Sequence, residues 1–497
     1  MTDTLNIPSE FFSLNSWKYV LSYNPFEPLI FNSGFFLFYF FVCILFYQLI
    51  VENKKARTIY LLIFSIFFYY KSSGMYFYLL ILSSLIDFAA GRYIALTGSQ
   101  LKKRLLLILS LAANLGILGY FKYTNFFIDT INTLSGSSFN ELDLFLPVGI
   151  SFFTFQSMSY TIDIYRGKLQ PEEKFLDFLF FVSFFPQLVA GPIVRASDFL
   201  PQISTGKELT RKNITRAFYL IILGLIKKAI IADYISINFV DRIFEMPLRY
   251  TGFENLLAVY GYALQIFCDF SGYSDMAIGL AMLLGFKLPE NFNTPYKSST
   301  ITEFWRRWHI SLSTWLKDYL YISLGGNRKG KMRRYYNLLL TMLLGGLWHG
   351  ASWKFVFWGG MHGLFLVIEK LFGIPEKIAN SRTLKIIGTI VTFHLVCFCW
   401  IFFRAESFDS GLDVLSQIFT FFHPEILSQF IDGYPVVIVL MIVGFITHFM
   451  PIKLEESVKN IVDRLNIPAL AFILSLVIWL VIQFKSADIH PFIYFQF

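Results

Sequence analysis

Charged residues are scarce in this sequence for its length. Asp, Glu, Lys and Arg make up 15% of the 497 residues, whereas hydrophobic residues make up 55%. A soluble protein of this size carries far more charge on its surface, so the composition excludes a chain of several soluble domains. Lipid is the expected surrounding of most of the chain.

Cysteine is rare as well, and its placement excludes two kinds of site. The four cysteines lie inside apolar runs, and none belongs to a CxxC pair or a paired framework. Disulfide scaffolds and structural zinc sites need such spacing, so we expect structural thiols and no bound metal. The positions are Cys43, Cys268, Cys397 and Cys399.

A cleavable secretory signal, an internal repeat and a low-complexity linker are not evident either. Residues 1–23 are mostly polar and lack a basic start followed by an apolar block, so the first span is expected to act as its own insertion signal. We predict an extracytoplasmic segment of unknown role over residues 1–28 and a single membrane domain over residues 29–497.

Long apolar runs are what the sequence has in abundance. A membrane-spanning helix needs roughly 20 apolar residues, and such runs recur from end to end. They predict an all-α polytopic membrane protein with about 11 to 14 transmembrane or re-entrant helices. The runs lie at 33–51, 58–70, 75–96, 104–122, 144–165, 175–194, 217–240, 254–285, 335–372, 383–403, 434–450 and 467–484. Two of them, 254–285 and 335–372, are long enough for two helices each. The expected breaks are at Ser271-Gly272 and near Gly345-Gly346 or Gly350.

The net charge of +8 is not arranged as a nucleic-acid groove. Basic residues gather in connectors at 54–57, 102–104 and 166–168, after the first, third and fifth runs. The positive-inside rule then places the N-terminus outside. A basic connector at 207–216 obeys the rule only if residues 175–194 re-enter the membrane. Helix breaks are available there at Pro186, Gly191 and Pro192.

The polar stretch 303–319 predicts an amphipathic helix with two distinct faces. One face is aromatic and apolar, and the other is polar. Its apolar face holds Trp305, Trp308, Leu312, Trp315 and Tyr319, and its polar face holds Arg306, His309, Ser313 and Lys317. An in-plane helix whose cations reach the lipid headgroups explains the arginine and the lysine. A chemical role competes with that explanation only for His309.

His349 lies in an apolar helix bracketed by glycines. Ionisable groups inside a membrane segment are costly and mark functional sites by default. A buried neutral imidazole can accept a proton from a hydroxyl that attacks an ester or a thioester. A histidine hydrogen-bonded between closely packed helices is the alternative, and the residues alone leave it open.

Two carboxylates, Asp269 and Asp275, interrupt the apolar run 254–285, and the polar loop 291–296 follows. They suggest a polar cavity wall, in which a carboxylate orients a histidine, or else a plain helix-breaking loop. A metal site is not expected, because no further ligands lie at useful spacing. The remaining histidines are interpreted as core or interface residues, namely His362, His394, His423, His448 and His490.

Four motifs and the C-terminal ending together resemble a known family. The motifs are PQLVAGPIVR from Pro186, DFSGYSDMAIG from Asp269, WRRWHISLSTWLKDYLYISLGGNR from Trp305 and GGLWHGASW from Gly345, and the ending is PFIYFQF from Pro491. The chain resembles the membrane-bound O-acyltransferase family, in its bacterial alginate O-acetyltransferase-like branch. The resemblance covers residues from about 29 to 497.

The resemblance implies a ring of tilted helices around a tunnel that joins the two faces of the bacterial inner membrane. His349 would be the catalytic base at its narrowest point, with His309 as the companion histidine. In much of the eukaryotic branch the companion is an asparagine. The residues expected to shape the tunnel or bind substrate are Trp305, Arg306, Trp308, Asp318, Asp269 and Tyr494.

The resemblance also implies the substrates and partners. Acetyl-coenzyme A or another cytosolic acyl thioester would be the donor, and no cofactor would be tightly bound. The acyl group would cross the membrane to an exported polysaccharide, helped by an extracytoplasmic acetyltransferase or esterase-like partner protein. Tyr494 could relay the acyl group as a covalent carrier or could simply anchor the chain at the interface.

Two other functional classes fit a polytopic chain with buried polar residues. One is a secondary transporter, and the other is a non-catalytic subunit of a polysaccharide export complex. Transporters often have paired halves, whereas the histidine motif occurs once. The sequence specifies neither the acceptor polymer nor the oligomeric state.

Overall fold

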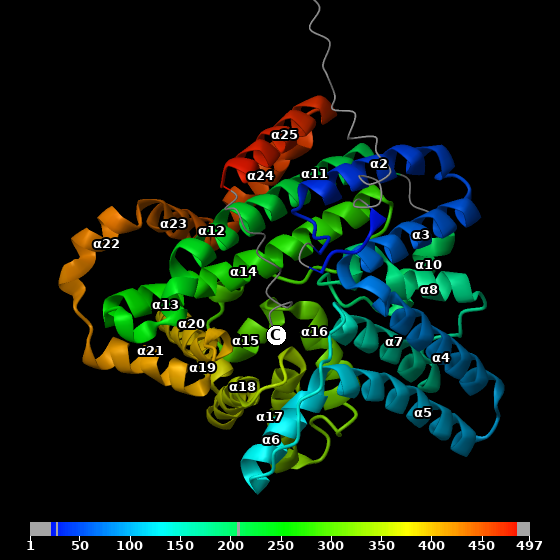
Figure 1. Ribbon diagram of the computed structural model, residues 1–497, viewed down its shortest axis with the longest axis horizontal. Coiled ribbons are helices and arrows are strands. Elements are labelled where there is room, and N and C mark those ends of the chain that lie inside the picture. The colour runs from blue at the N-terminus through cyan, green and yellow to red at the C-terminus, as the bar shows by residue number, and fades with distance from the viewer. Residues whose placement is uncertain (1–20, 26–27, 206–208, 485–497) are drawn as a thin grey trace, which may run out of the picture.

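The computed structural model describes residues 21–25, 28–205 and 209–484. Helices make up most of these residues, longer loops run over residues 136–149 and 284–300, and the described part of the chain contains no strand. Figure 1 shows the helices packed side by side around α14 (Gly252–Leu283). The prediction of an all-α architecture is confirmed. Most of the N-terminal segment 1–28, and Tyr494, lie outside the described residues.

The first part of the chain forms paired helices. They are α2 (Gly34–Ile50), α3 (Lys54–Ser73), α4 (Phe77–Leu96), α5 (Gln100–Leu118), the π-helical turn η3 (Gly119–Tyr123), α6 (Thr124–Ser135), α7 (Ile150–Tyr165), α8 (Phe175–Ser183), α9 (Phe185–Leu188) and α10 (Ala196–Thr205). Polar residues between the apolar runs begin several of them: the side chains of Ser33, Asn53 and Ser99 accept from backbone N–H groups of the first turn.

The middle part contains the longest helix and the shortest ones. It comprises α11 (Arg211–Leu225), the π turn η4 (Ile226–Ala232), α12 (Asp233–Ile235), the π turn η5 (Ser236–Val240), α13 (Asp241–Glu245), α14, α15 (Ile301–Arg307), α16 (Ile310–Trp315), the π turn η8 (Leu316–Tyr321), α17 (Gly330–His349) and α18 (Trp353–Phe372). The last part comprises α19 (Ile374–Ala379), α20 (Arg382–Arg404), α21 (Phe408–Thr420), α22 (Leu427–Gly433), α23 (Pro435–Phe449), α24 (Ile452–Arg464) and α25 (Ile467–Phe484).

Several helices are long and apolar enough to cross a membrane. Five segments pass by length and composition, and a sixth is the pair 424–433 and 435–449, which is bent by 101°. The five are Lys54–Leu96, Gln100–Ser135, Trp353–Phe372, Arg382–Arg404 and Ile467–Phe484. The chain is therefore a multi-pass membrane protein. Some of the other predicted runs form shorter helices, such as α2 and α8, or helices interrupted by π turns, such as α11 and η4.

The expected helix break at Ser271-Gly272 is wrong. Helix α14 runs unbroken for 32 residues through this point. A Cβ atom on Gly272 would lie 2.8 Å from the carbonyl oxygen of Gly224, and one on Gly224 would lie 2.5 Å from the carbonyl oxygen of Gly272. The glycine permits backbone contact between α11 and α14, which explains its presence without a bend.

The other two irregular regions agree with the sequence. Helix α17 ends at His349 and α18 begins at Trp353, so the run 335–372 breaks at Gly350. Helix α8 ends at Ser183, and the backbone is irregular from the end of α9 to Ala196. Residues 178–194 are all buried, as non-helical backbone at membrane depth requires.

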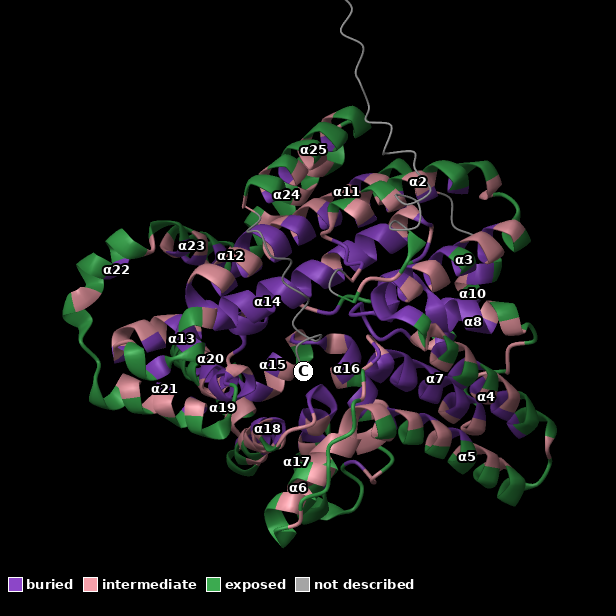
Figure 2. Ribbon diagram, in the orientation of Figure 1, coloured by how far each residue is buried: buried purple, intermediate pink, exposed green. Residues whose placement is uncertain are grey.

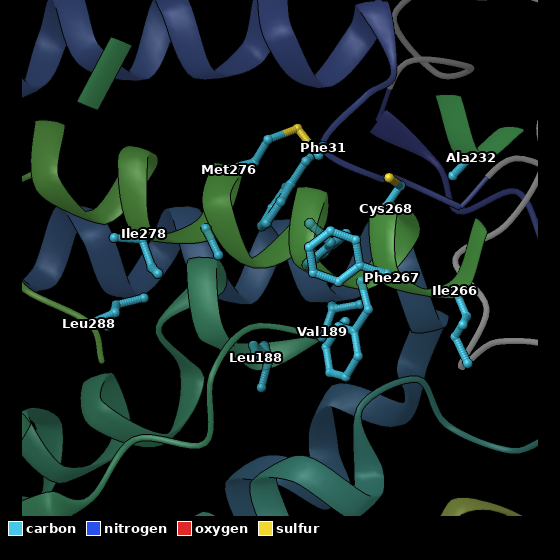
Figure 3. Packing of buried hydrophobic residues seen from close by; sticks show 14 of the residues in the cluster. Phe31, Leu188, Val189, Ala232, Ile266, Phe267, Cys268, Met276, Ile278 and Leu288 are labelled. Carbon is cyan, nitrogen blue, oxygen red and sulfur yellow. The ribbon is translucent and has the colours of Figure 1, made fainter. Parts of the chain in front are cut away.

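The core surrounds α14, whose residues are largely buried (Figure 2). Figure 3 shows buried side chains of this helix, such as Phe267 and Met276, and buried residues from other segments, such as Phe31 and Val189. The rings of Phe31 and Tyr273 stack at 4.4 Å. The Phe31 ring also lies 6.2 Å from that of Phe185 in α9, so it joins α9 to the helix that carries Asp269.

Candidate active site

The predicted helix over 303–319 is broken at its centre. Helix α15 ends at Arg307, α16 begins at Ile310, and His309 between them has a left-handed backbone with φ of 43°. The predicted polar face is therefore wrong: His309 is fully buried, whereas Arg306 and Lys317 remain exposed. A left-handed histidine is uncommon and persists only where surrounding contacts fix it.

The loop after α14 supplies those contacts through Asn291. Its carbonyl oxygen accepts from Ile310 N at 2.9 Å, and two residues later Asn293 N donates to the carbonyl oxygen of Arg307 at 2.9 Å. The Asn291 side-chain oxygen lies 3.1 Å from Nδ1 of His309. It also accepts from the backbone N and the hydroxyl of Ser311, at 3.2 and 2.9 Å. An oxygen at this position requires a donor, so Nδ1 carries the proton and Nε2 the lone pair.

His349 is the last residue of α17 and is 3% exposed. Its ring centroid lies 6.5 Å from that of His309. Aromatic rings enclose the pair: Trp358 lies 5.0 Å and Phe403 5.6 Å from His349, and Phe270 lies 4.6 Å from His309. The structure thus brings the two predicted histidines together in one buried cluster of aromatic rings, called the chamber below.

Glycines set the position of His349 by allowing α17 and α18 to touch. A Cβ on Gly346 would lie 2.2 Å from the carbonyl oxygen of Phe355, and one on Gly359 would lie 2.2 Å from that of Met342. A Cβ on Gly350 would meet the Phe355 ring at 2.1 Å. Close helix packing therefore explains Gly346 and Gly350, and it holds the end of α17 beside Trp358.

The other predicted residues lie at different distances from this chamber. Trp308 is 1% exposed and packs on Trp400, with ring centroids 5.0 Å apart. Trp305 packs on Trp358 at 5.7 Å. Asp318 forms an ion pair with Arg195 at 2.5 Å, and Arg306 is exposed on α15.

Asp269 has a structural partner. Its carboxylate forms an ion pair with the ammonium of Lys228, which also contacts Asp233 at 2.7 Å. The side chains of Lys228, Asp269 and Asp233 are each at most 19% exposed, so these charges neutralise one another inside the protein. The group that contacts His309 is the uncharged Asn291 amide, from the polar loop 291–296, and not the carboxylate that the sequence suggested.

A pocket of about 700 Å³ lies beside the chamber, between α11, α14, α24 and residues 285–294. It opens at exposed side chains such as Glu456 and reaches Asn291, so its inner wall touches the residue that holds His309. Ion pairs join Lys227 to Asp275 at 2.8 Å and Lys459 to Glu455 at 2.5 Å in the lining. The Lys459 hydrogen bond holds the pKa of Glu455 below its ordinary value.

Three residues near the histidines were not assigned to the site from the sequence. His362, assigned to the core, is fully buried, and its ring lies 4.7 Å from Trp358, which also contacts His349. Lys122 and Tyr123 reach the end of α17 from a distant helix. Their spacing from the histidine motifs carries no pattern. Among the described residues, no group of three His, Cys, Asp or Glu side chains could hold a metal ion.

Comparisons with known proteins fit this arrangement. Residues 172–412, which include both histidines, match the family model described as MBOAT, membrane-bound O-acyltransferase family. The chain is 38% identical over 413 residues to the protein named "Probable alginate O-acetylase AlgI" of Pseudomonas putida, covering 79% of this chain and 84% of that protein. It is 41% identical over 339 residues to the peptidoglycan O-acetyltransferase of Helicobacter pylori, covering 63% of this chain and 64% of that protein. It is 30% identical over 276 residues to the teichoic acid D-alanyltransferase of Bacillus subtilis, covering 52% and 69%.

Proposed function

The chain belongs to the membrane-bound O-acyltransferase family, and on this premise we propose that it moves an acetyl group from a cytosolic thioester to a hydroxyl of an exported polysaccharide. The observation that carries the proposal is the pair of buried imidazoles, with ring centroids 6.5 Å apart inside an aromatic chamber. Named relatives that transfer acyl groups to alginate, peptidoglycan or teichoic acid support an extracytoplasmic polymer as acceptor.

In the proposed reaction the acceptor hydroxyl attacks the carbonyl carbon of the thioester. His349 takes the hydroxyl proton as the new C–O bond forms. The tetrahedral intermediate then collapses, the C–S bond breaks, and the leaving sulfur receives that proton from His349. His309 has its lone pair on Nε2 and is proposed to position one of the two substrates. The surrounding rings exclude water, which would otherwise hydrolyse the thioester.

The pocket that reaches Asn291 is the proposed entrance for the donor. Its lining includes Arg216 and Lys287, neither of which forms an ion pair with another described residue. These cations suit a phosphate of acetyl-coenzyme A or of another acyl thioester. The basic segment 211–216 lies beside the pocket, and by the positive-inside rule it faces the cytosol.

Location and partners follow from the same proposal. We place the protein in the bacterial inner membrane, with its pocket on the cytosolic face and the acceptor on the opposite face. A separate extracytoplasmic acetyltransferase or esterase-like protein would select the polymer. No observation favours a transporter or a non-catalytic subunit over an acyltransferase. The relay by Tyr494 remains a prediction, since this residue lies outside the described part of the chain.

The proposal is tested with the purified protein reconstituted in lipid vesicles. Radiolabelled acetyl-coenzyme A is supplied on one side, and a polysaccharide together with an extract of the extracytoplasmic proteins is supplied on the other. We expect label in the polymer and unlabelled coenzyme A on the donor side, in amounts that rise together. Movement of intact acetyl-coenzyme A across the vesicle would instead identify a transporter, and no label in either polymer or lipid would contradict acyl transfer.

Trp358 is expected to limit the length of the acyl group. Its ring is 1% exposed and lies 5.0 Å from His349, so it occupies the space into which a longer acyl chain would extend. Trp358→Phe should raise the ratio of butyryl to acetyl transfer about 10-fold, because one methylene in an apolar pocket changes rates roughly 10- to 200-fold. Competing donors in one reaction measure this ratio. Trp479→Phe, at an exposed tryptophan of α25, is the matched control and should leave the ratio unchanged.

A further inference from the structure

Helix α17 ends in the interior of the protein, where its last carbonyl groups need partners. The final four carbonyl groups of any α-helix have no N–H donor within the helix. Here Trp348 is 4% and His349 is 3% exposed, and Gly350 after them is buried too. Water cannot satisfy these groups at such depth, so another part of the chain must do so.

Two consecutive residues of the π turn η3 supply the donors. The ammonium of Lys122 donates to the carbonyl oxygens of Trp348 at 2.7 Å and His349 at 3.0 Å. The phenol of Tyr123 donates to the carbonyl oxygen of Leu347 at 2.9 Å. Three of the last four carbonyls of the helix that carries His349 are thus held by residues more than 220 positions away in the sequence.

The position of Lys122 is unusual for a lysine. It lies within the candidate span Gln100–Ser135, in which an apolar window of 18 residues is only 17% buried inside the protein. A lysine in a membrane span is costly and marks a function by default, and π turns in helices are frequent at functional sites. Lys122 Nζ also lies 3.5 Å from the Ser151 hydroxyl and 5.9 Å from the Trp348 ring. The side chain therefore points inward to α17.

The charge of Lys122 matters because of what it faces. The C-terminus of a helix carries a partial negative charge, which here lies at the backbone of His349. An ammonium group on the two terminal carbonyls offsets that charge and fixes their direction. The other titratable groups facing His349 are the imidazoles of His309 and His362. Among these three neighbours Lys122 is the only amine, and it carries a positive charge when it is protonated.

We propose that Lys122 is a positioning residue for the reaction: it fixes the imidazole of His349 for proton transfer and offsets the negative end of α17. Tyr123 assists by holding the preceding turn. The proposal rests on the proposed function, since it concerns the base of acyl transfer. The competing explanation is that the lysine only stabilises the fold.

The test compares variants of the full-length protein in vesicles. Lys122→Met keeps the length of the side chain but loses the charge and the donors, and we expect kcat to fall at least 10-fold with the donor KM changed less than 2-fold. Lys122→Arg retains both properties and should recover most of kcat. Tyr123→Phe should lower kcat only a few-fold. Lys102→Met, at the exposed start of α5, is the control and should match the wild type.

A cryo-EM structure of Lys122→Met provides a measurement that does not depend on activity. We expect the His349 ring to leave its position 5.0 Å from Trp358. The proposal would be overturned if Lys122→Met left kcat unchanged. It would also be overturned if Lys122→Met raised KM by the same factor as it lowered kcat and Lys122→Arg did not restore either constant. A wild type without transfer activity would overturn the proposed function instead, and the position of the ring in the two structures would then decide the inference.

Discussion

Replacing His349 by glutamine is expected to reduce acetyl transfer by about a hundred- to ten-thousand-fold, the range in which a general base contributes. Glutamine can form hydrogen bonds but cannot take up the hydroxyl proton at neutral pH. The side chains are similar in size, so glutamine can occupy the space between Trp358 and Phe403, and the carbonyl group of residue 349 keeps its hydrogen bond to Lys122. We therefore expect normal expression and an unchanged melting temperature, so the loss would concern chemistry alone.

The measurement is the initial rate of label incorporation from acetyl-coenzyme A, with thermal unfolding recorded on the same preparation. His423→Gln is the matched control, because this histidine is exposed and pairs with Glu425 at 2.6 Å on the surface. It should retain the wild-type rate. A His349→Gln protein within three-fold of the wild type would show that another group accepts the proton.

Asn291→Leu is expected to reduce transfer by about 10- to 100-fold, as the loss of a group that orients a functional histidine commonly does in metal sites. The substitution keeps the volume of the side chain but removes an oxygen that meets His309 and Ser311. Because these contacts fix the left-handed backbone at His309, the imidazole should lose both its tautomer and its direction. The buried donors left behind should also lower the melting temperature.

Asn291→Asp tests whether the side-chain oxygen alone orients the His309 ring or whether the amide group is required. Its carboxylate preserves the oxygen, so we expect it to recover part of the rate lost in Asn291→Leu. Asn380→Leu serves as the control, since this exposed asparagine contacts only its own helix through Glu376 in the described structure. If Asn291→Leu were as active as the wild type, His309 would need no orientation or would have no part in the reaction.

The helices could be predicted from the sequence because lipid requires long apolar runs. The run 467–484 coincides with α25, and the break at Gly350 follows from a glycine that ends one helix before another begins. His349 was conspicuous as an imidazole among apolar neighbours, whereas His309 was singled out by the resemblance to the family. Each of these features depends on residues that are close together in the sequence, so it could be recognised without knowledge of the fold.

The details of the site depended on contacts that no local pattern carries. A period of three and four residues predicts one helix over 303–319, but hydrogen bonds from Asn291 break it at His309. The pairing of Asp269 with Lys228 brings together two helices, so the carboxylate alone could not reveal its partner. The contact of Lys122 could not be predicted from the sequence either, since the carbonyl groups that accept its hydrogen bonds belong to a helix more than 200 residues away.

The left-handed backbone at position 309 restricts which amino acids can replace the histidine there. Branched or bulky side chains clash in that conformation, whereas asparagine, aspartate and glycine adopt it most readily. Among these, only asparagine offers a neutral side chain able both to donate and to accept a hydrogen bond. Asparagine is thus the replacement for His309 that this backbone conformation would permit during divergence.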